Sequence, residues 1–350
     1  MKYCKQYWQD LDCVSKCIPH LERFKNKRVF ISGASGLIGS AIADLCFFLN
    51  KERNANMRIY LAGRNKNRIA ERFYTFQENQ DYEFVLFEAT LFNTLSIHAD
   101  FWIHAASPAD PRQISSFPIE TMMANFVGLN NILSVASQQD EARVLYVSSS
   151  EVYGTKDSST SYKEEDLGYV DILNPRASYP CSKRAGETLC VAYGKEHCLD
   201  TVIVRPGHIY GPTMTDEDSR VSSQFPREIL AGKPIVMKSK GEQLRSYCYV
   251  LDCASAILTV LLNGEKGNAY NISNKDSVVT IREMAEAFAK AGNQQIIFEI
   301  PSTEEKKSYN LMNNSSLNAE KLEQLGWKAW FNMQEGAEHT LKILQKEAHT

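Results

Sequence analysis

A stretch of eight residues, from Ser32 to Gly39, constrains the fold of this chain more than any other sequence feature. It directly follows the apolar run Val29-Phe30-Ile31 and carries glycines at positions 33, 36 and 39. Glycines at this spacing permit a tight turn, a close approach of backbone to pyrophosphate, and close packing of a helix on a strand. A helix beginning near Gly36 would direct its free N–H groups and its positive dipole end at the phosphates. We therefore predict a dinucleotide-binding unit of strand, turn and helix.

Short apolar runs alternate with amphipathic helical segments along most of the chain. The runs predict β-strands at residues 29–31, 57–61, 84–87, 101–104, 144–147 and 201–204. Strands that are apolar throughout and separated by helices are typical of a parallel sheet covered on both faces. The expected fold class is α/β, with a Rossmann-type doubly wound parallel sheet and a smaller, mixed α/β substrate-binding C-terminal domain.

The pattern divides the chain into three parts. Residues 1–27 are polar with apolar positions at near-helical spacing, which predicts a helical N-terminal extension. Residues 28–205, with about 246–272, form the expected dinucleotide-binding Rossmann domain. Residues 206–245 and 273–350, with a predicted helix over 280–292, form the expected substrate-binding domain. That domain would cover the carboxyl edge of the sheet, where ligands bind in such folds.

The charge balance and the cysteine pattern argue against several classes of protein. Lys and Arg total 39 against 42 Asp and Glu, a net charge of −3, whereas nucleic-acid binders normally carry a strongly basic field. No apolar run approaches the roughly 18 residues of a membrane helix, and residues 1–10 lack a signal-peptide core. Neither the nine scattered cysteines nor the seven histidines show a metal-ligand spacing. We expect a soluble cytoplasmic protein with reduced thiols, no metal, no membrane contact and no nucleic-acid partner.

The end of the second predicted strand bears on the choice of cofactor. A carboxylate normally holds the adenosine ribose about 20 residues after the glycine loop. Here the strand ends in Leu61-Ala62-Gly63-Arg64-Asn65-Lys66, with no acid. Arg64 and Lys66 could instead meet a 2′-phosphate, although Arg64 could equally stack on adenine or face solvent. Both NAD and NADP therefore remain open at this point.

A second constellation suggests catalysis. Tyr179 and Lys183 are four residues apart and would share one face of a helix. A lysine ammonium there favours tyrosinate, a general base for a sugar or alcohol hydroxyl while a nicotinamide takes the hydride. The predicted strand over 144–147 ends in Ser148-Ser149-Ser150-Glu151, at the sheet edge where a hydroxyl could polarise the reacting oxygen.

These motifs resemble those of the extended short-chain dehydrogenase/reductases, specifically the NAD-dependent nucleotide-sugar epimerase/dehydratase family. The similar segments cover almost the whole chain beyond Ser32. They are the glycine loop, His104 to Pro108, Asn125 with Gly128, Ser150 to Gly154, Tyr179 with Lys183, Arg205 to Pro212, and Leu317 to Trp327.

Within that family, four segments are most similar to the UDP-glucuronate decarboxylases, also called UDP-xylose synthases. They are Ala106-Ser107-Pro108-Ala109-Asp110-Pro111, near the family's Ala-Ser-Pro-Ala-Ser-Pro; Ser149-Ser150-Glu151, near Thr-Ser-Glu; Asn174 to Tyr179 with Lys183-Arg184; and Arg220 to Phe225 with Gly241 to Arg245. Ser150 stands where the 4,6-dehydratases carry an acidic aspartate, and plain 4-epimerases usually lack the glutamate present here as Glu151.

The resemblance implies an NAD(P)-dependent nucleotide-sugar carboxy-lyase that converts UDP-glucuronate to UDP-xylose or a 4-keto product. Tyr179 would take the C4 hydroxyl proton, Ser149 would polarise that oxygen, and Lys183 would favour the tyrosinate. The resulting 4-ketone makes the C5 carboxylate a β-keto acid, which loses carbon dioxide before hydride returns to C4. Arg245 would lie by the carboxylate, while Ser150 and Glu151 would organise the site and the water that reprotonates C5.

The resemblance also implies the binding residues. A tightly bound, recycled NAD or NADP would contact Gly33, Ser35, Gly36, Leu37, Ile38, Gly39, Arg64, Ala105, Ala106, Ser107, Asn125, Tyr179, Lys183 and Pro206. The nucleotide sugar would contact Pro108, Arg176, His208, Arg220, Ser222 and Arg245. The helices that contain Asn125 and Tyr179 would pair across a homodimer in a four-helix contact. A surface polysaccharide is a natural destination for the product.

Several alternatives remain open. His208 and Thr213 depart from the decarboxylase pattern, which has asparagine and arginine there, and His208 could hydrogen-bond a sugar or phosphate or donate a proton. Glu151 could complement a helix dipole, Arg245 could bind only the diphosphate, and Arg176 could be a surface or dimer-interface residue. The rival activities are a nucleotide-sugar 4-epimerase, a 4,6-dehydratase or a net reductase on another sugar nucleotide. A non-catalytic cofactor-binding protein is a remote alternative.

Overall fold

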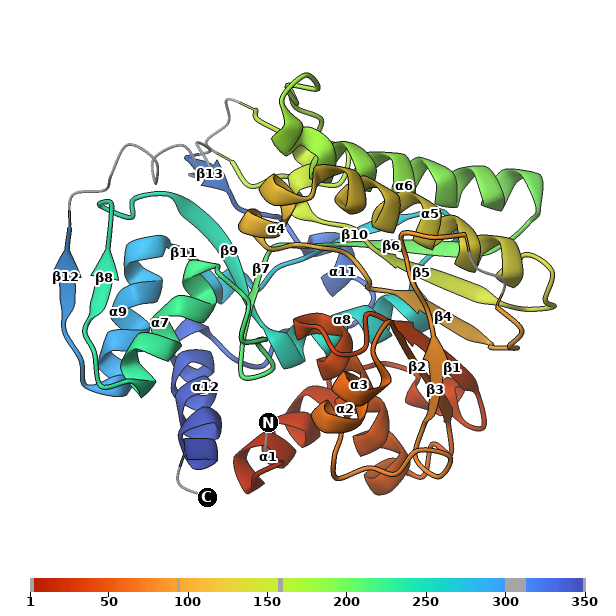
Figure 1. Ribbon diagram of the computed structural model, residues 1–350, viewed down its shortest axis with the longest axis horizontal. Helices are drawn as coiled ribbons and strands as arrows, with labels where there is room; N and C mark the ends of the chain where they lie inside the picture. The colour runs from red at the N-terminus through yellow and green to blue at the C-terminus, as the bar shows by residue number, and fades with distance from the viewer. Residues whose placement is uncertain (1–2, 93–94, 157–159, 300–312, 349–350) are drawn as a thin grey trace.

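Seven parallel strands form the main sheet of the structure, a computed structural model that describes residues 3–92, 95–156, 160–299 and 313–348 (Figure 1). Their order is β10-β6-β5-β4-β1-β2-β3, so the chain winds outward in both directions from β1. The strands are β1 (Arg28–Ser32), β2 (Arg58–Gly63), β3 (Glu83–Leu86), β4 (Phe101–His104), β5 (Arg143–Val147), β6 (Asp200–Pro206) and β10 (Ala269–Ile272). The predicted α/β class and all six predicted strands are confirmed, with small shifts at the strand ends.

Alternate residues along each strand enter two separate cores. Val29 and Ile31 of β1 join the core beneath α2 (Leu37–Arg53) and α8 (Val250–Asn263). Phe30 points the other way, into the core beneath α5 (Pro118–Ala136) and α6 (Ser178–Glu196). Both faces of the sheet are therefore covered, which is why its strands are apolar at every position. Figure 1 shows α5 and α6 above the sheet and α2 below it.

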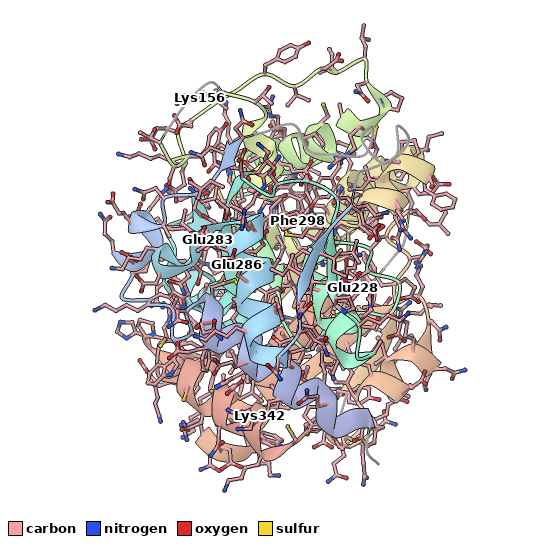
Figure 2. The ribbon with its side chains drawn as sticks, turned by 90° about the vertical axis from the view of Figure 1, so that its left-hand side faces the viewer. Lys156, Glu228, Glu283, Glu286, Phe298 and Lys342 are labelled. Atoms are coloured by element: carbon pink, nitrogen blue, oxygen red, sulfur yellow. The ribbon has the colours of Figure 1, made fainter. Side chains whose placement is uncertain are left out.

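A second lobe begins directly after the C-terminal end of β6, with Gly207 as the link. It holds a four-stranded sheet of β7 (His208–Tyr210), β9 (Leu244–Tyr249), β11 (Val278–Thr280) and β13 (Asn314–Ser315), and a pair of strands, β8 (Ile235–Met237) and β12 (Ile296–Phe298). Its main helices are α7 (Val221–Leu230), α9 (Ile281–Gly292) and α12 (Met333–Ala348). Figure 2 looks onto this lobe, with Glu283 on α9 and Phe298 on β12. The predicted helix over 280–292 is confirmed as α9.

Short helices complete the described chain. They are η1 (Leu21–Phe24), α3 (Lys66–Arg72), α4 (Pro111–Ser116), η2 (Ser150–Tyr153), η3 (Pro175–Ala177), η4 (Lys275–Ser277) and α11 (Glu320–Glu323). We propose the same division as the sequence suggests: 28–205 with about 246–272 as one domain, and 206–245 with 273–350 as the other.

The N-terminal helix α1 (Lys5–Ser15) connects the two lobes. On the side of the main sheet, Tyr3 and Tyr7 each donate a 2.6 Å hydrogen bond to Asp44 of α2. On the side of the second lobe, Asp10 accepts from the Tyr249 hydroxyl at 3.0 Å and lies 2.9 Å from His339 of α12. The predicted N-terminal helix is therefore present and bonded to both lobes.

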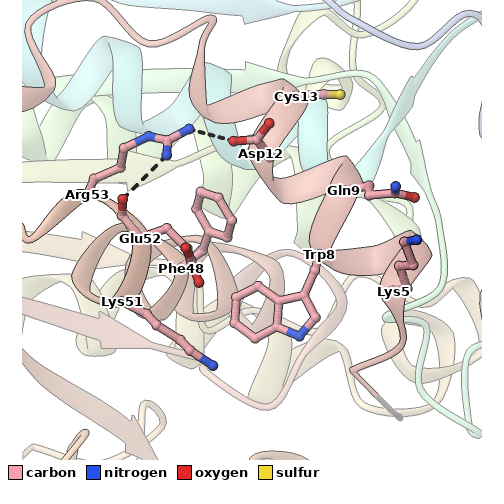
Figure 3. Close-up of a pocket in the computed structure, with 9 residues that line it drawn as sticks. All are labelled: Lys5, Trp8, Gln9, Asp12, Cys13, Phe48, Lys51, Glu52 and Arg53. Carbon is pink, nitrogen blue, oxygen red and sulfur yellow. Dashed lines mark hydrogen bonds and ion pairs between the residues drawn. The ribbon is translucent and has the colours of Figure 1, made fainter.

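A hollow of about 730 Å³ lies between α1 and α2 (Figure 3). It is lined by Lys5, Trp8, Gln9, Asp12, Cys13, Phe48, Lys51, Glu52 and Arg53. None of the predicted site residues lines this hollow. We attribute it to the packing of α1 against α2.

Asp252 makes unfolding of the protein pH-dependent. This buried residue in the first turn of α8 accepts hydrogen bonds from the N–H groups of Trp330 (2.8 Å) and Phe331 (2.9 Å). Burial nevertheless raises the pKa of its carboxyl to about 7, above the value of about 3.9 in an unfolded chain. Between these pKa values the folded state binds the extra proton, so the contribution of Asp252 to the free energy of unfolding falls as pH rises.

The comparison variant is Asp252→Asn, which keeps an acceptor oxygen and cannot ionise. Subtracting its free energy of unfolding in urea from that of the parent protein should leave a difference that decreases between about pH 4 and pH 7. A difference that stays constant across this range would show that Asp252 is ionised in the folded protein.

No helix in the described residues is long and apolar enough to cross a membrane.

Candidate active site

The glycine loop forms the turn between β1 and α2. Gly33 has a φ of 70°, and a Cβ there would lie 2.7 Å from the carbonyl oxygen of Ala105, in the loop after β4. A Cβ on Gly39 would collide with the Gly33 carbonyl, so α2 packs directly against the turn. Gly36 caps α2 without a side-chain hydrogen bond, which leaves the first N–H groups of the helix for phosphate oxygens. This cradle fits the pyrophosphate of a dinucleotide, with Ser35, Leu37 and Ile38 on the same turn.

Four of the predicted cofactor residues lie at the C-terminal ends of β4 and β6. Ala105, Ala106 and Ser107 follow β4, and Pro206 ends β6, two strands away. Asn125 of α5 donates to the Ser182 hydroxyl of α6 at 3.0 Å, while its buried Oδ1 has no hydrogen-bond partner among the described residues. An unpaired acceptor in the interior is costly, so this oxygen suits a donor from a ligand or a water.

Arg64 and Lys66 both have acidic neighbours. Arg64 is exposed just beyond β2, with Nε 3.8 Å from a carboxylate oxygen of Glu88. The Lys66 ammonium lies 2.8 Å from Glu78. Their charges are already partly compensated, which weakens the sequence argument for a 2′-phosphate at this position.

Tyr179 and Lys183 share the buried face of α6, as the spacing predicts. The Lys183 ammonium donates to the Val147 carbonyl at the end of β5 (2.7 Å) and lies 5.7 Å from the centre of the Tyr179 ring. Burial lowers the pKa of Lys183 to about 7, against the opposing effect of the Glu187 carboxylate. Lys183 therefore holds a proton that it can readily give up near neutral pH.

The Tyr179 hydroxyl lies among charged groups of both signs. Burial, reinforced by the negative charge of Glu151, raises the pKa of Tyr179 to about 12. A hydrogen bond from the Ser149 hydroxyl and the positive charges of Arg220 and Arg176 act in the opposite direction. A tyrosine that must lose its proton depends on such groups, and the structure brings Ser149 to it from the end of β5.

The segment after β5 also carries Ser150 and Glu151, in the short helix η2. The Ser149 hydroxyl caps this helix by accepting from the Glu151 N–H at 3.2 Å. Arg176, just before α6, donates to the Glu151 carboxylate at 2.8 Å, and both side chains are about one-third exposed. This ion pair holds the Arg176 guanidinium close enough to Tyr179 for its charge to lower the pKa of that residue.

His208 of the second lobe lies near Arg245 and Arg220, and Arg220 acts in turn on Tyr179. Burial, with the positive charges of Arg245 and Arg220, lowers the pKa of His208 to about 3. The ring is therefore neutral at pH 7, which favours a role for His208 as a hydrogen-bonding group over one as a proton donor. The main reason is burial of the ring, and the pairing of β7 with β9 adds a nearby guanidinium.

Arg245 of β9 is only 3% exposed, yet its guanidinium donates to a neutral group, the carbonyl of Leu244, at 2.8 Å. No carboxylate is among the groups that act on this guanidinium within the described parts of the chain, and burial lowers its pKa. A buried cation without an anion is unfavourable, so Arg245 suits a ligand that carries negative charge.

Arg220 and Ser222 lie where α7 begins. Arg220 makes two hydrogen bonds to Asp218, at 2.9 and 2.6 Å, and Ser222 is buried in the first turn of α7. Thr213, which departs from the family's arginine, donates instead to the Leu37 carbonyl in the first turn of α2 (2.8 Å). Pro108 lies in the loop after β4. The second lobe thus touches the glycine-loop helix directly.

Glu187 is a site residue that the sequence reasoning missed. Its carboxylate accepts from the Ser148 hydroxyl at 2.5 Å and from Arg205 of β6 at 3.0 and 2.6 Å. It therefore ties the ends of β5 and β6 to α6, one turn beyond Lys183. The four-residue spacing from Tyr179 to Lys183 to Glu187 is the signal that could have found it.

Comparisons with known proteins agree with this arrangement. The sequence model of the NAD dependent epimerase/dehydratase family matches residues 29–273. UDP-glucuronic acid decarboxylase 1 of Xenopus tropicalis is 30% identical over 333 residues, which cover 94% of this chain and 75% of that protein. UDP-glucuronic acid decarboxylase 3 of Arabidopsis thaliana is 30% identical over 311 residues, 89% of this chain and 87% of that protein.

A likeness among solved structures supports the fold. UDP-glucuronic acid 4-epimerase from Bacillus cereus, in complex with UDP-glucuronic acid and NAD, superimposes with a TM-score of 0.75 at 19% identity. The match covers 91% of this chain and 99% of that one.

Proposed function

Because the chain belongs to the NAD dependent epimerase/dehydratase family, we propose that it decarboxylates UDP-glucuronate by transient oxidation at C4 of the sugar. The product would be UDP-xylose if hydride returns to C4, or a 4-keto sugar if hydride stays on the nicotinamide, which would then be left reduced. Relatives named as decarboxylases over most of their length support this choice. The observation that carries it is Arg245, a buried guanidinium without a carboxylate partner among the described residues.

The residues of the chain divide the reaction between them. Tyr179 would take the C4 hydroxyl proton, and the Ser149 hydroxyl would polarise the same C4 oxygen. The Lys183 ammonium, which lies over the Tyr179 ring, would favour the tyrosinate. Bound nicotinamide would accept hydride from C4 and later return it. Arg245 would hold and orient the carboxylate at C5, which becomes a β-keto acid once C4 is a ketone. The electrons of the broken C–C bond then pass to the ketone, and carbon dioxide leaves.

Ser150 and Glu151 complete this proposal. The Glu151 carboxylate is held by Arg176 and would order the water that protonates C5. A serine at position 150 lacks the carboxyl group that would protonate a departing C6 hydroxyl. This difference favours decarboxylation over 4,6-dehydration.

The test uses UDP-glucuronate labelled with ¹³C at the carboxyl group, incubated with the purified protein in a sealed vessel. Labelled carbon dioxide in the headspace, in proportion to consumed substrate, is the expected result. Consumption of substrate with the label retained in the sugar would point instead to a 4-epimerase and contradict decarboxylation.

We propose NAD, tightly bound and recycled, as the cofactor. The support is the pairing of Arg64 with Glu88 and of Lys66 with Glu78, which leaves less positive charge for a 2′-phosphate. Chromatography of the nucleotide released from denatured protein would identify it, and recovery of NADP would overturn this assignment. The nine cysteines are all free, which supports a reducing, cytoplasmic location.

We further propose a homodimer through the outer face of α5 and α6. Large apolar side chains are exposed there, namely Ile119, Met122, Met123, Phe126 and Val191. Replacing Phe126 with aspartate should convert a dimer into a monomer, because a buried charge would oppose association. Light scattering after size-exclusion chromatography measures this change.

The matched control is Phe298→Asp, which puts the same charge at an exposed phenylalanine of β12, far along the chain in the second lobe. It should leave the oligomeric state unchanged. A parent protein that is monomeric at micromolar concentration, or a dimer that survives Phe126→Asp, would refute this interface.

A further inference from the structure

Asp110 lies in the loop after β4 and uses its two carboxylate oxygens on two different elements. Oδ1 caps α4 by accepting from the N–H groups of Arg112 (2.9 Å) and Gln113 (3.1 Å). Oδ2 accepts from both the N–H (2.7 Å) and the hydroxyl (2.5 Å) of Ser219. The carboxylate is buried and fully hydrogen-bonded, and it links the main sheet to a distant segment of the second lobe.

That segment, residues 213–220, connects β7 to α7 and is bonded to the first lobe at three points. Thr213 donates to the Leu37 carbonyl, Glu217 pairs with Arg68 at 2.9 Å, and Ser219 donates to Asp110. The Arg68 pair is exposed on both sides, and such pairs contribute little to stability. The charge-assisted bonds to Asp110 are therefore the strongest of the three anchors.

Arg220 follows Ser219 directly and faces the catalytic cluster. Its guanidinium donates two hydrogen bonds to the Asp218 carboxylate, which also accepts from the Ser223 hydroxyl at 2.8 Å. Arg220 is one of the positive charges that act on Tyr179, and it also feels the charge of Asp110. The location of this guanidinium thus depends on where the 213–220 segment is held.

We propose that Asp110 is a positioning residue that anchors the 213–220 segment across the two lobes and thereby holds Arg220 toward Tyr179. The inference rests on the proposed function, because it gives Asp110 a part in the same reaction. The decarboxylase motif that residues 106–111 resemble has serine at the position of Asp110. A serine has a single side-chain oxygen on a shorter side chain. That oxygen can cap α4, but it cannot also accept the hydrogen bonds from Ser219.

The variant Asp110→Ser therefore separates the two roles, because serine is itself a good helix cap. We expect amide exchange in a peptide spanning 213–224, measured by hydrogen–deuterium exchange, to be faster by about tenfold. We also measure the pH dependence of kcat. The apparent pKa that reports deprotonation of Tyr179 should rise by about half a pH unit, because the Arg220 guanidinium, which lowers this pKa, is no longer fixed. In an Arg220→Gln background the same change at Asp110 should leave this apparent pKa unchanged.

Glu217→Gln is the matched control, because it removes the exposed anchor of the same segment. It should alter neither the exchange nor the pH profile appreciably. Unchanged amide exchange of the 213–224 peptide in Asp110→Ser would show that Asp110 does not anchor the segment. Faster exchange with an unchanged pH profile of kcat would show that the anchor does not position Arg220. If the parent protein does not turn over UDP-glucuronate, the proposed function fails by itself, and the exchange comparison still decides the anchor.

Discussion

Replacing Tyr179 with phenylalanine is expected to lower kcat by a factor of about 1,000, because the loss of a general base typically costs between 100- and 10,000-fold. The change removes one oxygen from a buried side chain whose hydroxyl hydrogen-bonds to Ser149. Bound cofactor should be retained, since the glycine loop, the loop after β4 and Lys183 are untouched. The measurement is single-turnover formation of product, with the nucleotide content of the protein determined in parallel.

Tyr210→Phe is the control for this experiment. Tyr210 is equally buried, in the second lobe, and its hydroxyl has no hydrogen-bond partner among the described residues. Its loss should leave kcat within about twofold, because an unsatisfied buried hydroxyl contributes nothing to the reaction. A Tyr179→Phe protein with at least a tenth of the parent activity would contradict the role of Tyr179 as base.

Replacing Asp44 with alanine is expected to lower the free energy of unfolding by about 3–5 kcal/mol, the usual cost of leaving a buried charge without its partner. The Asp44 carboxylate is inaccessible to solvent and accepts from Arg72 at 2.5 Å as well as from Tyr3 and Tyr7. Without it, the nearly buried guanidinium of Arg72 would lie among aromatic rings. Urea unfolding followed by circular dichroism measures the change.

The companion variant is Tyr7→Phe, which removes one neutral donor from the same carboxylate. Its expected cost is about 1 kcal/mol, the typical net value of a single hydrogen bond. Comparing the two losses of stability separates the cost of leaving Arg72 as an unpaired buried charge from the cost of weakening the contacts of α1. An Asp44→Ala protein no less stable than Tyr7→Phe would show that Arg72 finds another partner or reaches water. If Asp44→Ala does not fold, Asp44→Asn should give a smaller loss in the same direction.

The sheet and the juxtaposition of Tyr179 with Lys183 could be predicted because both depend on local patterns. A strand buried on both faces must be apolar at every position, as in Val144 to Val147, and this pattern is visible without any tertiary information. Tyr179 and Lys183 are neighbours simply because four residues make about one helical turn. The glycine loop is recognisable for a similar reason, since Gly33 must adopt a positive φ against Ala105.

The parts that could not be predicted depend on contacts between distant segments. Asp110 meets Ser219 only because the second lobe folds back over the loop after β4. His208 is neutral because the fold buries its ring and because β7 pairs with β9 and brings Arg245 close. Neither effect can be read from its sequence neighbours. Strand β10 was not predicted, although it forms an edge of the main sheet beside β6. Its four residues, Ala269 to Ile272, include the polar Asn271, which interrupts the apolar pattern.

The central claim is that this site converts UDP-glucuronate by oxidation at C4 followed by loss of the carboxyl group. Mass spectrometry of the nucleotide sugar after anaerobic incubation with the purified protein, without added cofactor, tests it most directly. We predict a product lighter than the substrate by one carbon dioxide, absent from reactions with Tyr179→Phe. A nucleotide sugar of unchanged mass, whether epimerised or untouched, would contradict the decarboxylase assignment.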